Sequence, residues 1–353
     1  MENKRLYVDI HVLQSMPPSC VNRDDTGSPK TAEYGGVTRA RVSSQAWKKA
    51  VRAMFLDIFP QERLGTRSKK VLSLLEKELE KAGAQEPAAL AKTVLSAGIK
   101  LKEDQTGALF FISRAQVSAL AELALRHQEK PLTDTLKAEA LKALKTSPGI
   151  DIALFGRMVA DEPSLNTDAC AQVAHAISTH AVSNEYDYFT AVDDLAPEDN
   201  MGAGHLGTVE FNSATLYRYA TVAVHALQEE LGDEAPAAVT GFVKAFALSM
   251  PTGKQNTFAN RTLPDAVLVT LRHDQPVNLV GAFEKPVYAN QGGYMEASAQ
   301  RLVDYTQTLL ADFAGQPDLA LVTGAALEPL GQRLSFEQLL ISLEAALNRP
   351  GQP

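Results

Sequence analysis

The chain has 353 residues, of which 45% are hydrophobic and 22% are charged, and its formal net charge at pH 7 is -8. This composition is typical of folded globular proteins and excludes wholesale disorder. No apolar run approaches the roughly 20 residues that span a bilayer, so we expect no membrane association. Because the chain has only two cysteines, it excludes a disulfide framework and a four-cysteine zinc site, and we expect a cytoplasmic protein.

The charge is distributed unevenly along the chain. Residues 1–52 contain nine Lys/Arg and five Asp/Glu, a net charge of +4, so the rest of the chain is acidic. A polyanion needs only a locally positive surface, because each neutralised phosphate releases counterions whatever charge lies elsewhere. A basic N-terminal segment on an acidic body is therefore compatible with nucleic-acid binding.

The N-terminal region predicts a strand, a long loop and a helix. In residues 6–13 apolar side chains recur with a period of two, which indicates a half-buried strand. Residues 14–40 are rich in Pro, Gly, Asn and Asp and predict a long loop, which in a compact protein is usually functional or disordered. A short extended segment at residues 38–42 then leads into a helix that runs through Phe55, with Ser43 or Ser44 as its N-cap.

Residues 60–145 are rich in Ala, Leu, Lys and Glu and predict a mainly helical insertion. Two of its helices are expected to end at Gly83 and Gly98. A short buried strand at residues 109–112 is expected to precede a helix capped by Ser113, and a last helix follows Thr133.

Strand character returns after the insertion. Residues 150–155 and 173–179 predict strands, and residues 181–224 predict two strands joined by a long projecting excursion. Further helices are expected over residues 237–250, 297–314 and 335–348, with a loop at 251–264 and strands at 266–271 and 319–322. Strands and helices that alternate without an exact repeat indicate an α+β fold with insertions.

Motifs for catalysis and metal binding are weak in this sequence. His175 and His180 lie five residues apart, a spacing that sends strand side chains to opposite faces, so they cannot share one zinc ion. We expect no metal and no cofactor. The nearest approach to a phosphate loop, residues 251–256, lacks the second glycine. The adjacent acids Asp24 and Asp25 could hold Mg²⁺, although consecutive acids in loops more often form turns.

The basic segment at residues 38–52 carries the strongest local signal. Arg39 and Arg41 are two residues apart on an extended segment and are expected to project from the same face. One face of the following helix collects the polar side chains Gln45, Lys48, Lys49 and Arg52. Another face, expected to pack on the core, collects Ala46, Ala50, Ala53 and Met54. Amides at the helix N-terminus favour a phosphate, so this segment suits a nucleic-acid backbone; the alternative is a solvated basic helix.

Motif blocks spread over most of the chain resemble the CasC-type backbone subunit of the type I-E CRISPR surveillance complex, Cascade. The longest block is residues 8–49. The others follow in the same order at residues 149–158, 174–180, 189–195, 205–208, 217–219 and 253–255. The insertion at residues 60–145 and the C-terminal part of the chain match only loosely.

The resemblance implies a modified RNA-recognition-motif (ferredoxin-like) palm with a helical finger insertion and a projecting β-hairpin thumb. The implied palm comprises residues 1–59, 146–180 and 210–353, the fingers residues 60–145, and the thumb residues 181–209. Copies of such a subunit stack in a helical filament along the guide RNA (crRNA), and each thumb crosses the RNA bound by its neighbour. The implied partners are crRNA, the target DNA strand paired to it, copies of the same chain and the other Cascade subunits.

The resemblance also carries RNA contacts of the family onto matching residues. The contacts of the palm with the guide backbone fall on Arg23, Ser43, Gln45, Lys48 and Lys49. Met158 matches an apolar wedge beside a kinked nucleotide, and the thumb residues that interrupt the base stack match Tyr188, Phe189, Thr190 and Val192. Tyr188 stands where the family has a tryptophan, so its stacking area is smaller. The predicted RNA contacts also include Arg39, Arg41 and Arg52 of the basic segment and three further basic residues: Lys30, Arg157 and Lys254.

Together these observations predict a non-catalytic RNA-binding scaffold, in which base pairing by the guide reads the target. Two alternatives stay open. The first is a metal-dependent RNase similar to the backbone subunits of type III effector complexes, with Asp24 or Asp25 as the loop aspartate. The second is a stand-alone single-stranded RNA binder that does not polymerise.

Overall fold

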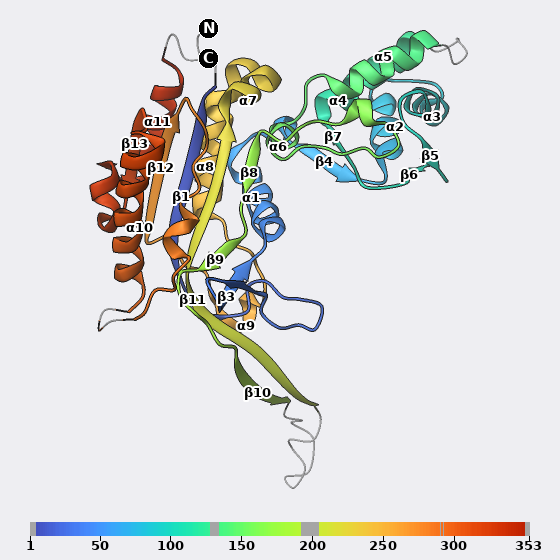
Figure 1. Ribbon diagram of the computed structural model, residues 1–353. Coiled ribbons are helices and arrows are strands. Elements are labelled where there is room, and N and C mark those ends of the chain that lie inside the picture. The colour runs from blue at the N-terminus through green and yellow to red at the C-terminus, as the bar shows by residue number, and fades with distance from the viewer. Residues whose placement is uncertain (1–4, 128–133, 192–204, 290, 292, 350–353) are drawn as a thin grey trace. The chain divides into compact units, whose positions relative to one another are not determined.

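The structure of the protein is a computed structural model that describes residues 5–127, 134–191, 205–289, 291 and 293–349 (Figure 1). The chain forms two compact units. The first, which we name the sheet unit, comprises Met1–Ala53, Val173–Thr221 and Phe242–Gln352. The second, which we name the helical unit, comprises Met54–Gln172 and Val222–Gly241.

The sheet unit is built on a ten-stranded sheet with the strand order β14-β13-β12-β1-β11-β9-β3-β2, in which β8 and β10 also pair with β11. The strands are β1 (Tyr7–Ser19), β2 (Thr31–Tyr34), β3 (Val37–Val42), β8 (Ala171–Val173), β9 (Ala176–Ser178), β10 (Glu185–Ala191), β11 (His205–Ala223), β12 (Ala266–Arg272), β13 (Leu319–Thr323) and β14 (Gln332–Arg333). β12 pairs antiparallel with both β1 and β13, whereas β13 and β14 are parallel. Residues 14–40, predicted as a loop, thus contain the end of β1, all of β2 and the start of β3.

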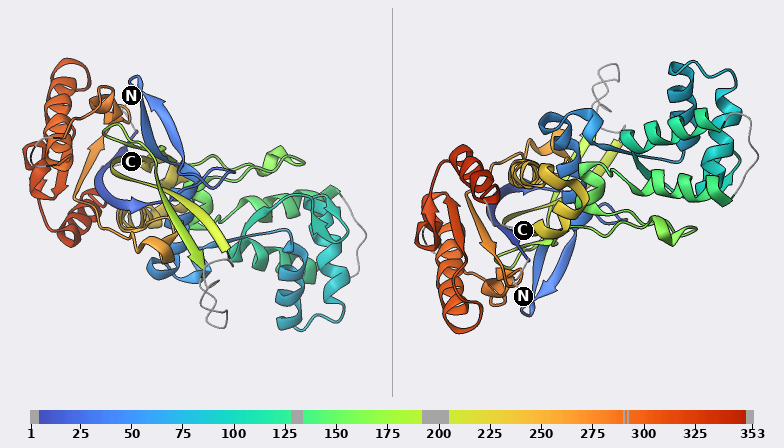
Figure 2. Two further views of the ribbon diagram at one scale, coloured as in Figure 1. Left: turned by 90° about the horizontal axis from the view of Figure 1, so that it is seen from below. Right: turned by 90° about the horizontal axis from the view of Figure 1, so that it is seen from above.

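Helices interleave with these strands, which confirms the predicted α+β class. Their bounds are α1 (Ser44–Ile58), α2 (Val71–Lys81), α3 (Pro87–Gly98), α4 (Arg114–Arg126), α5 (Asp134–Lys145), α6 (Ile150–Phe155), α7 (Val224–Leu231), α8 (Ala235–Leu248), α9 (Gln255–Phe258), α10 (Met295–Leu309) and α11 (Phe336–Leu347). Both views of Figure 2 show α10 and α11 beside β12 and β13. A π-helical turn, Leu310–Ala314, follows α10 and accounts for the rest of the helix predicted at 297–314.

Helices cover both faces of the sheet. On β11, Tyr217 packs in one apolar cluster with Leu302 of α10, whereas the neighbouring Arg218 donates to the Phe246 carbonyl of α8. Successive strand residues point to opposite faces, so these contacts place α10 and α8 on opposite sides. For this reason β1 is buried on both faces along residues 8–14, and the expectation of a half-buried strand is wrong.

The helical unit has its own core. α2 to α5 bury apolar side chains against one another, among them Leu75, Leu95, Leu120 and Leu136. Two short antiparallel sheets, β4 (Gly65–Ser68) with β7 (Phe110–Ser113) and β5 (Leu101–Lys102) with β6 (Gln105–Thr106), complete the unit. Ser113 caps α4, as predicted, in a reciprocal capping box with its third helical residue.

The helical unit is larger than the predicted insertion of residues 60–145, because it also includes residues 146–172 and 222–241. Residues 150–155, predicted as a strand, form α6. A six-residue apolar run does not distinguish a buried strand from a buried helix. Gly156 follows α6 with a φ of 77°, a conformation that glycine adopts without strain and that stops a helix.

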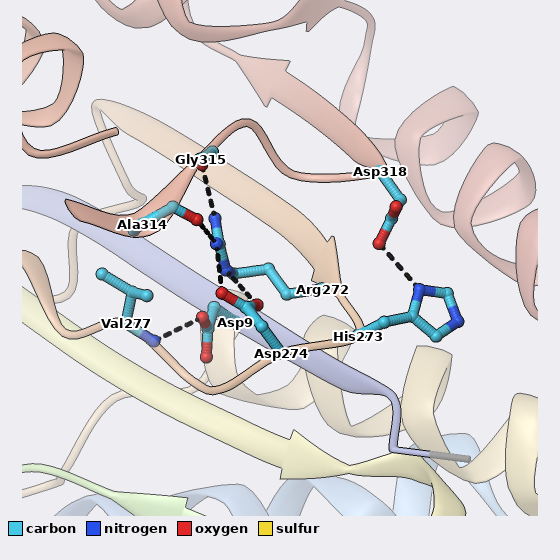
Figure 3. Close-up of polar contacts among 8 residues, drawn as sticks. All are labelled: Asp9, Arg272, His273, Asp274, Val277, Ala314, Gly315 and Asp318. Atoms are coloured by element: carbon cyan, nitrogen blue, oxygen red, sulfur yellow. Dashed lines mark hydrogen bonds and ion pairs between the residues drawn. The ribbon is translucent and has the colours of Figure 1, made fainter. Parts of the chain in front are cut away.

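The end of β12 carries a buried arginine that ties it to the segment after α10 (Figure 3). Arg272 is 4% exposed and donates to the Gly315 carbonyl at 3.2 Å and to the Asp274 carboxylate at 2.7 Å. Beside it, the buried carboxylate of Asp9 accepts a hydrogen bond from the Val277 N–H at 2.8 Å. All of these contacts are internal, so the cluster stabilises the fold.

His11 on β1 makes the sheet unit sensitive to acid. Its Nδ1 lies 2.9 Å from the Tyr217 hydroxyl, and complete burial lowers the pKa of His11 from 6.5 to about 3. Between these pH values the unfolded chain binds a proton that the folded chain does not, so the free energy of unfolding falls as the pH is lowered. One such histidine contributes at most about 1.4 kcal/mol per pH unit.

We therefore expect the wild-type protein to lose more stability than His11→Gln on going from about pH 7 to about pH 5. Urea unfolding of both proteins at the two pH values measures the difference. Equal losses would contradict the assignment.

Candidate nucleic-acid interface

The basic helix predicted from the sequence begins where β3 ends. Ser43 is its N-cap: its Oγ accepts the Ala46 N–H at 3.4 Å, and its own N–H donates to the Asn22 Oδ1 at 2.8 Å. Ser43 is only 5% exposed, so its hydroxyl serves the helix cap, and the prediction that it contacts RNA is not supported. Asn22 was not predicted; its amide joins the preceding loop to the start of α1.

The core-facing side of α1 differs from the prediction. Trp47, Val51 and Phe55 are fully buried, at the four-residue spacing that aligns side chains along one face. Ala53, by contrast, is exposed, and the other residues of the predicted core face are half-buried. Large side chains at this spacing bury more apolar area than alanines do, and they fix the rotation of the helix.

The polar face of α1 agrees with its predicted helical spacing. Gln45 and Lys49 are exposed, whereas Lys48 and Arg52 are half-buried. Partial burial lowers the pKa of Lys48, because the charged ammonium loses hydration. Of the three cations on this face, Lys49 is therefore accessible to solvent, and Lys48 and Arg52 are partly covered.

A loop adds further cations beside the start of α1. The Lys30 N–H donates to the Asn22 carbonyl at 2.8 Å, and the Arg41 N–H donates to the Lys30 carbonyl at 2.9 Å. Arg23, one residue after Asn22, is exposed. These backbone bonds connect the loop to β3, and the Asn22 side chain connects it to the N-cap of α1.

Gly253 brings a second loop to this region. A Cβ at this position would lie 2.0 Å from the Val21 carbonyl oxygen, so only glycine permits this approach. The neighbouring Lys254 and Arg23 both lie close enough to Cys20 for their charges to oppose the rise in thiol pKa that burial causes. We name the whole set the basic surface of the sheet unit; its members are Arg23, Lys30, Arg41, Gln45, Lys48, Lys49, Arg52 and Lys254.

Arg39 does not belong to the basic surface, and the expectation that it projects beside Arg41 is wrong. It is fully buried, and its guanidinium donates to the carbonyls of Phe283 at 2.9 Å and Ser178 at 3.0 Å. Burial lowers the pKa of Arg39. Side chains alternate between the two faces of β3 as predicted, but at residue 39 the segments that contain Ser178 and Phe283 cover the face.

Arg157 is a second correction. In the helical unit it is 5% exposed and donates to the carbonyls of Leu144 at 2.8 Å and Phe111 at 3.1 Å. Burial lowers its pKa to about 10. A guanidinium engaged in this way joins elements of the unit and is not available to a phosphate. The next residue, Met158, is 84% exposed and lines a small pocket together with Leu109.

The predicted thumb contains a two-stranded ribbon. β10 pairs antiparallel with the first part of β11, from Glu185 opposite Phe211 to Ala191 opposite His205, and Figure 1 shows the ribbon extending away from the rest of the sheet. Every described side chain of β10 is exposed. Val192 and residues 193–204 lie outside the described residues.

Tyr188 and Phe189 lie on opposite faces of this ribbon, because strand side chains alternate. Tyr188 is 67% exposed and shares its face with Tyr186 and Thr190, whereas Phe189 is 45% exposed. The ring of Phe189 packs over Gly207 on β11, where a Cβ would lie 2.4 Å from the ring. The two aromatic residues therefore offer surfaces on different sides.

The loop acids and the histidines have local roles. The Asp24 carboxylate accepts hydrogen bonds from the Thr26 hydroxyl at 2.7 Å and from the Ser28 N–H at 3.0 Å, and such bonds lower its pKa. Both ring nitrogens of His180 bond to backbone, and Nδ1 of His175 lies 3.2 Å from the Arg41 guanidinium.

Within the described part of the chain, no three His, Cys, Asp or Glu side chains gather in a way that could hold a metal ion. Nor does any helix of that part have the length and apolar character to cross a membrane.

Residues 8–347 match the family described as CT1975-like protein. Two solved structures are similar over nearly their whole length. One, described as a CRISPR RNA-guided surveillance complex in a pre-nicking state, is 35% identical with a TM-score of 0.82, and the match covers 96% of this chain and 99% of that one. The other, described as a CRISPR RNA-guided surveillance complex, is 31% identical with a TM-score of 0.65 and the same coverage. No curated protein matches.

Proposed function

The chain belongs to the CT1975-like protein family, and we propose that it is a non-catalytic backbone subunit of a type I-E CRISPR surveillance complex that binds crRNA in antiviral defence in the cytoplasm. The basic surface of the sheet unit is the observation that carries this proposal. It gathers seven Lys or Arg side chains from two loops, β3 and α1, although the whole chain has a net charge of -8. The similarity to chains of RNA-guided surveillance complexes supplies the partner class.

The basic surface fits the backbone of RNA. Exposed Lys49 and Arg23 can neutralise phosphates and release counterions, which gives affinity without sequence preference. The N-terminus of α1 adds backbone amides that favour an anion at the same place. Sequence recognition is then left to base pairing between the guide and the target DNA strand.

The ribbon of β10 and β11 is proposed to act as the thumb. Its exposed aromatic side chains suit bases that have left the stack, because any base can stack on an aromatic face. Copies of the chain would then line the guide as a filament, with each ribbon over the RNA of its neighbour and with other subunits at the ends. In this proposal the sheet unit takes the role of the palm, the helical unit that of the fingers, and the ribbon that of the thumb.

No structural observation favours the RNase alternative. The Asp24 carboxylate is engaged in its own turn. Among the described residues, Asp25 belongs to no group of three His, Cys, Asp or Glu side chains that could hold a metal ion. An aspartate that shapes a turn needs no metal.

Size-exclusion chromatography with light scattering, with and without a repeat-derived guide RNA, tests the proposal. We expect the RNA to convert the protein into particles that contain several chains per RNA, and to remain intact in the presence of Mg²⁺ or Mn²⁺. One chain per RNA at saturation would indicate the stand-alone binder. Regularly spaced, metal-dependent cuts that Asp24→Ala or Asp25→Ala abolishes would indicate the nuclease.

A further inference from the structure

Two residues contact the guanidinium of Arg41: Thr31 on β2 and His175 just before β9. Its Nε donates to the Thr31 carbonyl of β2 at 3.1 Å, and its Nη1 lies 3.2 Å from Nδ1 of His175. His175 immediately precedes β9, on which Ile177 is the antiparallel partner of Arg41. Contacts at two different nitrogens fix both the position and the plane of a guanidinium.

The chemistry of this pair defines the state of the imidazole. A guanidinium only donates hydrogen bonds and stays charged, so Nδ1 of His175 must accept. The ring is then neutral, with its proton on Nε2. Partial burial and the charges of Arg41 and Lys30 lower the pKa of His175, which keeps the ring neutral at neutral pH.

We propose that His175 is a positioning residue for RNA binding: its neutral imidazole holds the Arg41 guanidinium so that its remaining N–H groups face a phosphate of the bound RNA. This inference rests on the proposed function of the basic surface. His175 itself need not touch RNA. Its contribution is to order a long side chain before binding, which removes part of the entropy loss on complex formation.

Four proteins test the inference: wild type, His175→Ala, His175→Asn and Arg41→Ala. Asparagine places a neutral oxygen acceptor close to the position of Nδ1. With a fluorescent single-stranded RNA at about pH 7.5, we expect His175→Ala to weaken binding about threefold to tenfold, and His175→Asn to bind like wild type. Arg41→Ala should weaken binding at least as much as His175→Ala.

The double variant decides whether His175 acts through Arg41. In the Arg41→Ala background, His175→Ala should cause no further loss. Additive losses, or wild-type binding by His175→Ala, would overturn the inference. If His175→Ala does not fold, as judged by its thermal transition, His175→Leu takes its place, because leucine keeps apolar volume without an acceptor.

Lys49→Glu separates this inference from the function on which it rests. Lys49 lies on α1, is exposed and is not a member of the Arg41–His175 pair. If Lys49→Glu binds RNA like wild type, the proposed function of the basic surface is wrong. If Lys49→Glu weakens binding but His175→Ala does not, only the role of His175 is wrong.

Discussion

The double charge reversal Lys48→Glu with Lys49→Glu should abolish the retention of guide RNA while the chain stays folded. Both lysines lie on the polar face of α1 next to its N-terminus. A hydrogen bond to a charged group is worth about 1.5–3 kcal/mol, so removal of two lysine–phosphate bonds reduces affinity by about 100-fold or more. The slope of log affinity against log salt should fall by about 0.7 for each phosphate of a single strand that the variant no longer neutralises. Titrations at several salt concentrations measure both quantities.

The matched control for this variant is Lys142→Glu with Lys145→Glu, which makes the same charge change on two exposed lysines of α5. The control should bind RNA nearly like wild type, because the basic surface keeps its charge. Since Lys48 is half-buried, the single variant Lys49→Glu separates loss of binding from loss of folding. Wild-type affinity and salt slope in the double variant would show that the basic surface does not bind RNA.

Local patterns predicted the polar face of α1 and the cap of α4, because helix periodicity and capping depend on residues a few positions apart. They also identified the family: the resemblance of the motif blocks to a CRISPR backbone subunit is confirmed by the family match and by two structures at 31% and 35% identity. The type I-E assignment, the filament and the RNA contacts remain predictions, as do the boundaries of palm, fingers and thumb.

The buried arginines show where sequence reasoning ends. Arg39 and Arg157 both lie in motif blocks, and nothing in their local sequence separates them from Arg41 or Lys49. The carbonyls that accept from their guanidinium groups include distant ones, Phe283 for Arg39 and Leu144 for Arg157. Only the tertiary fold determines which cations are covered, because burial depends on contacts between distant segments. A buried arginine needs several hydrogen-bond acceptors around its guanidinium, and the sequence does not show which carbonyls will lie there.

The strand predicted at residues 150–155 is a helix, and the reason for this error is related. Period alone does not separate a short buried helix from a buried strand, although the glycines at positions 149 and 156 are compatible with a short helix between them. The core face of α1 differs from the prediction because the predicted face, three alanines and Met54, leaves out Trp47, whose ring is fully buried under the Arg218 guanidinium at 3.7 Å from the ring centre. Volume, as well as spacing, decides which face turns inward.

The ribbon of β10 and β11 exposes two aromatic rings, those of Tyr188 and Phe189. Tyr188→Ala and Phe189→Ala should each weaken retention of the guide or of the paired target, and the double variant should weaken it more. Stacking of one base on an aromatic side chain is worth about 1–3 kcal/mol. Because the two rings lie on opposite faces of the ribbon, their effects are expected to be independent and nearly additive.

Stability provides the first control. Both side chains are largely exposed, so the melting temperature of the free chain should hardly change. Phe189 packs over Gly207, and for this reason a small loss is expected there but not for Tyr188. Tyr288→Ala, at a 75% exposed tyrosine of the sheet unit outside the ribbon, is the matched variant and should leave RNA retention unchanged.

Chemical probing of the bound guide at nucleotide resolution gives the decisive measurement. If each ribbon unstacks a base of the RNA on the neighbouring subunit, wild-type particles should show an exposed nucleotide at regular intervals, with protected segments between. The periodic signal should weaken in both single variants, and the variant with the larger loss identifies the face of the ribbon that contributes more to stacking. Uniform reactivity along the guide in wild-type particles would exclude a stacking thumb, because a wedge repeated in every subunit must leave a repeated mark.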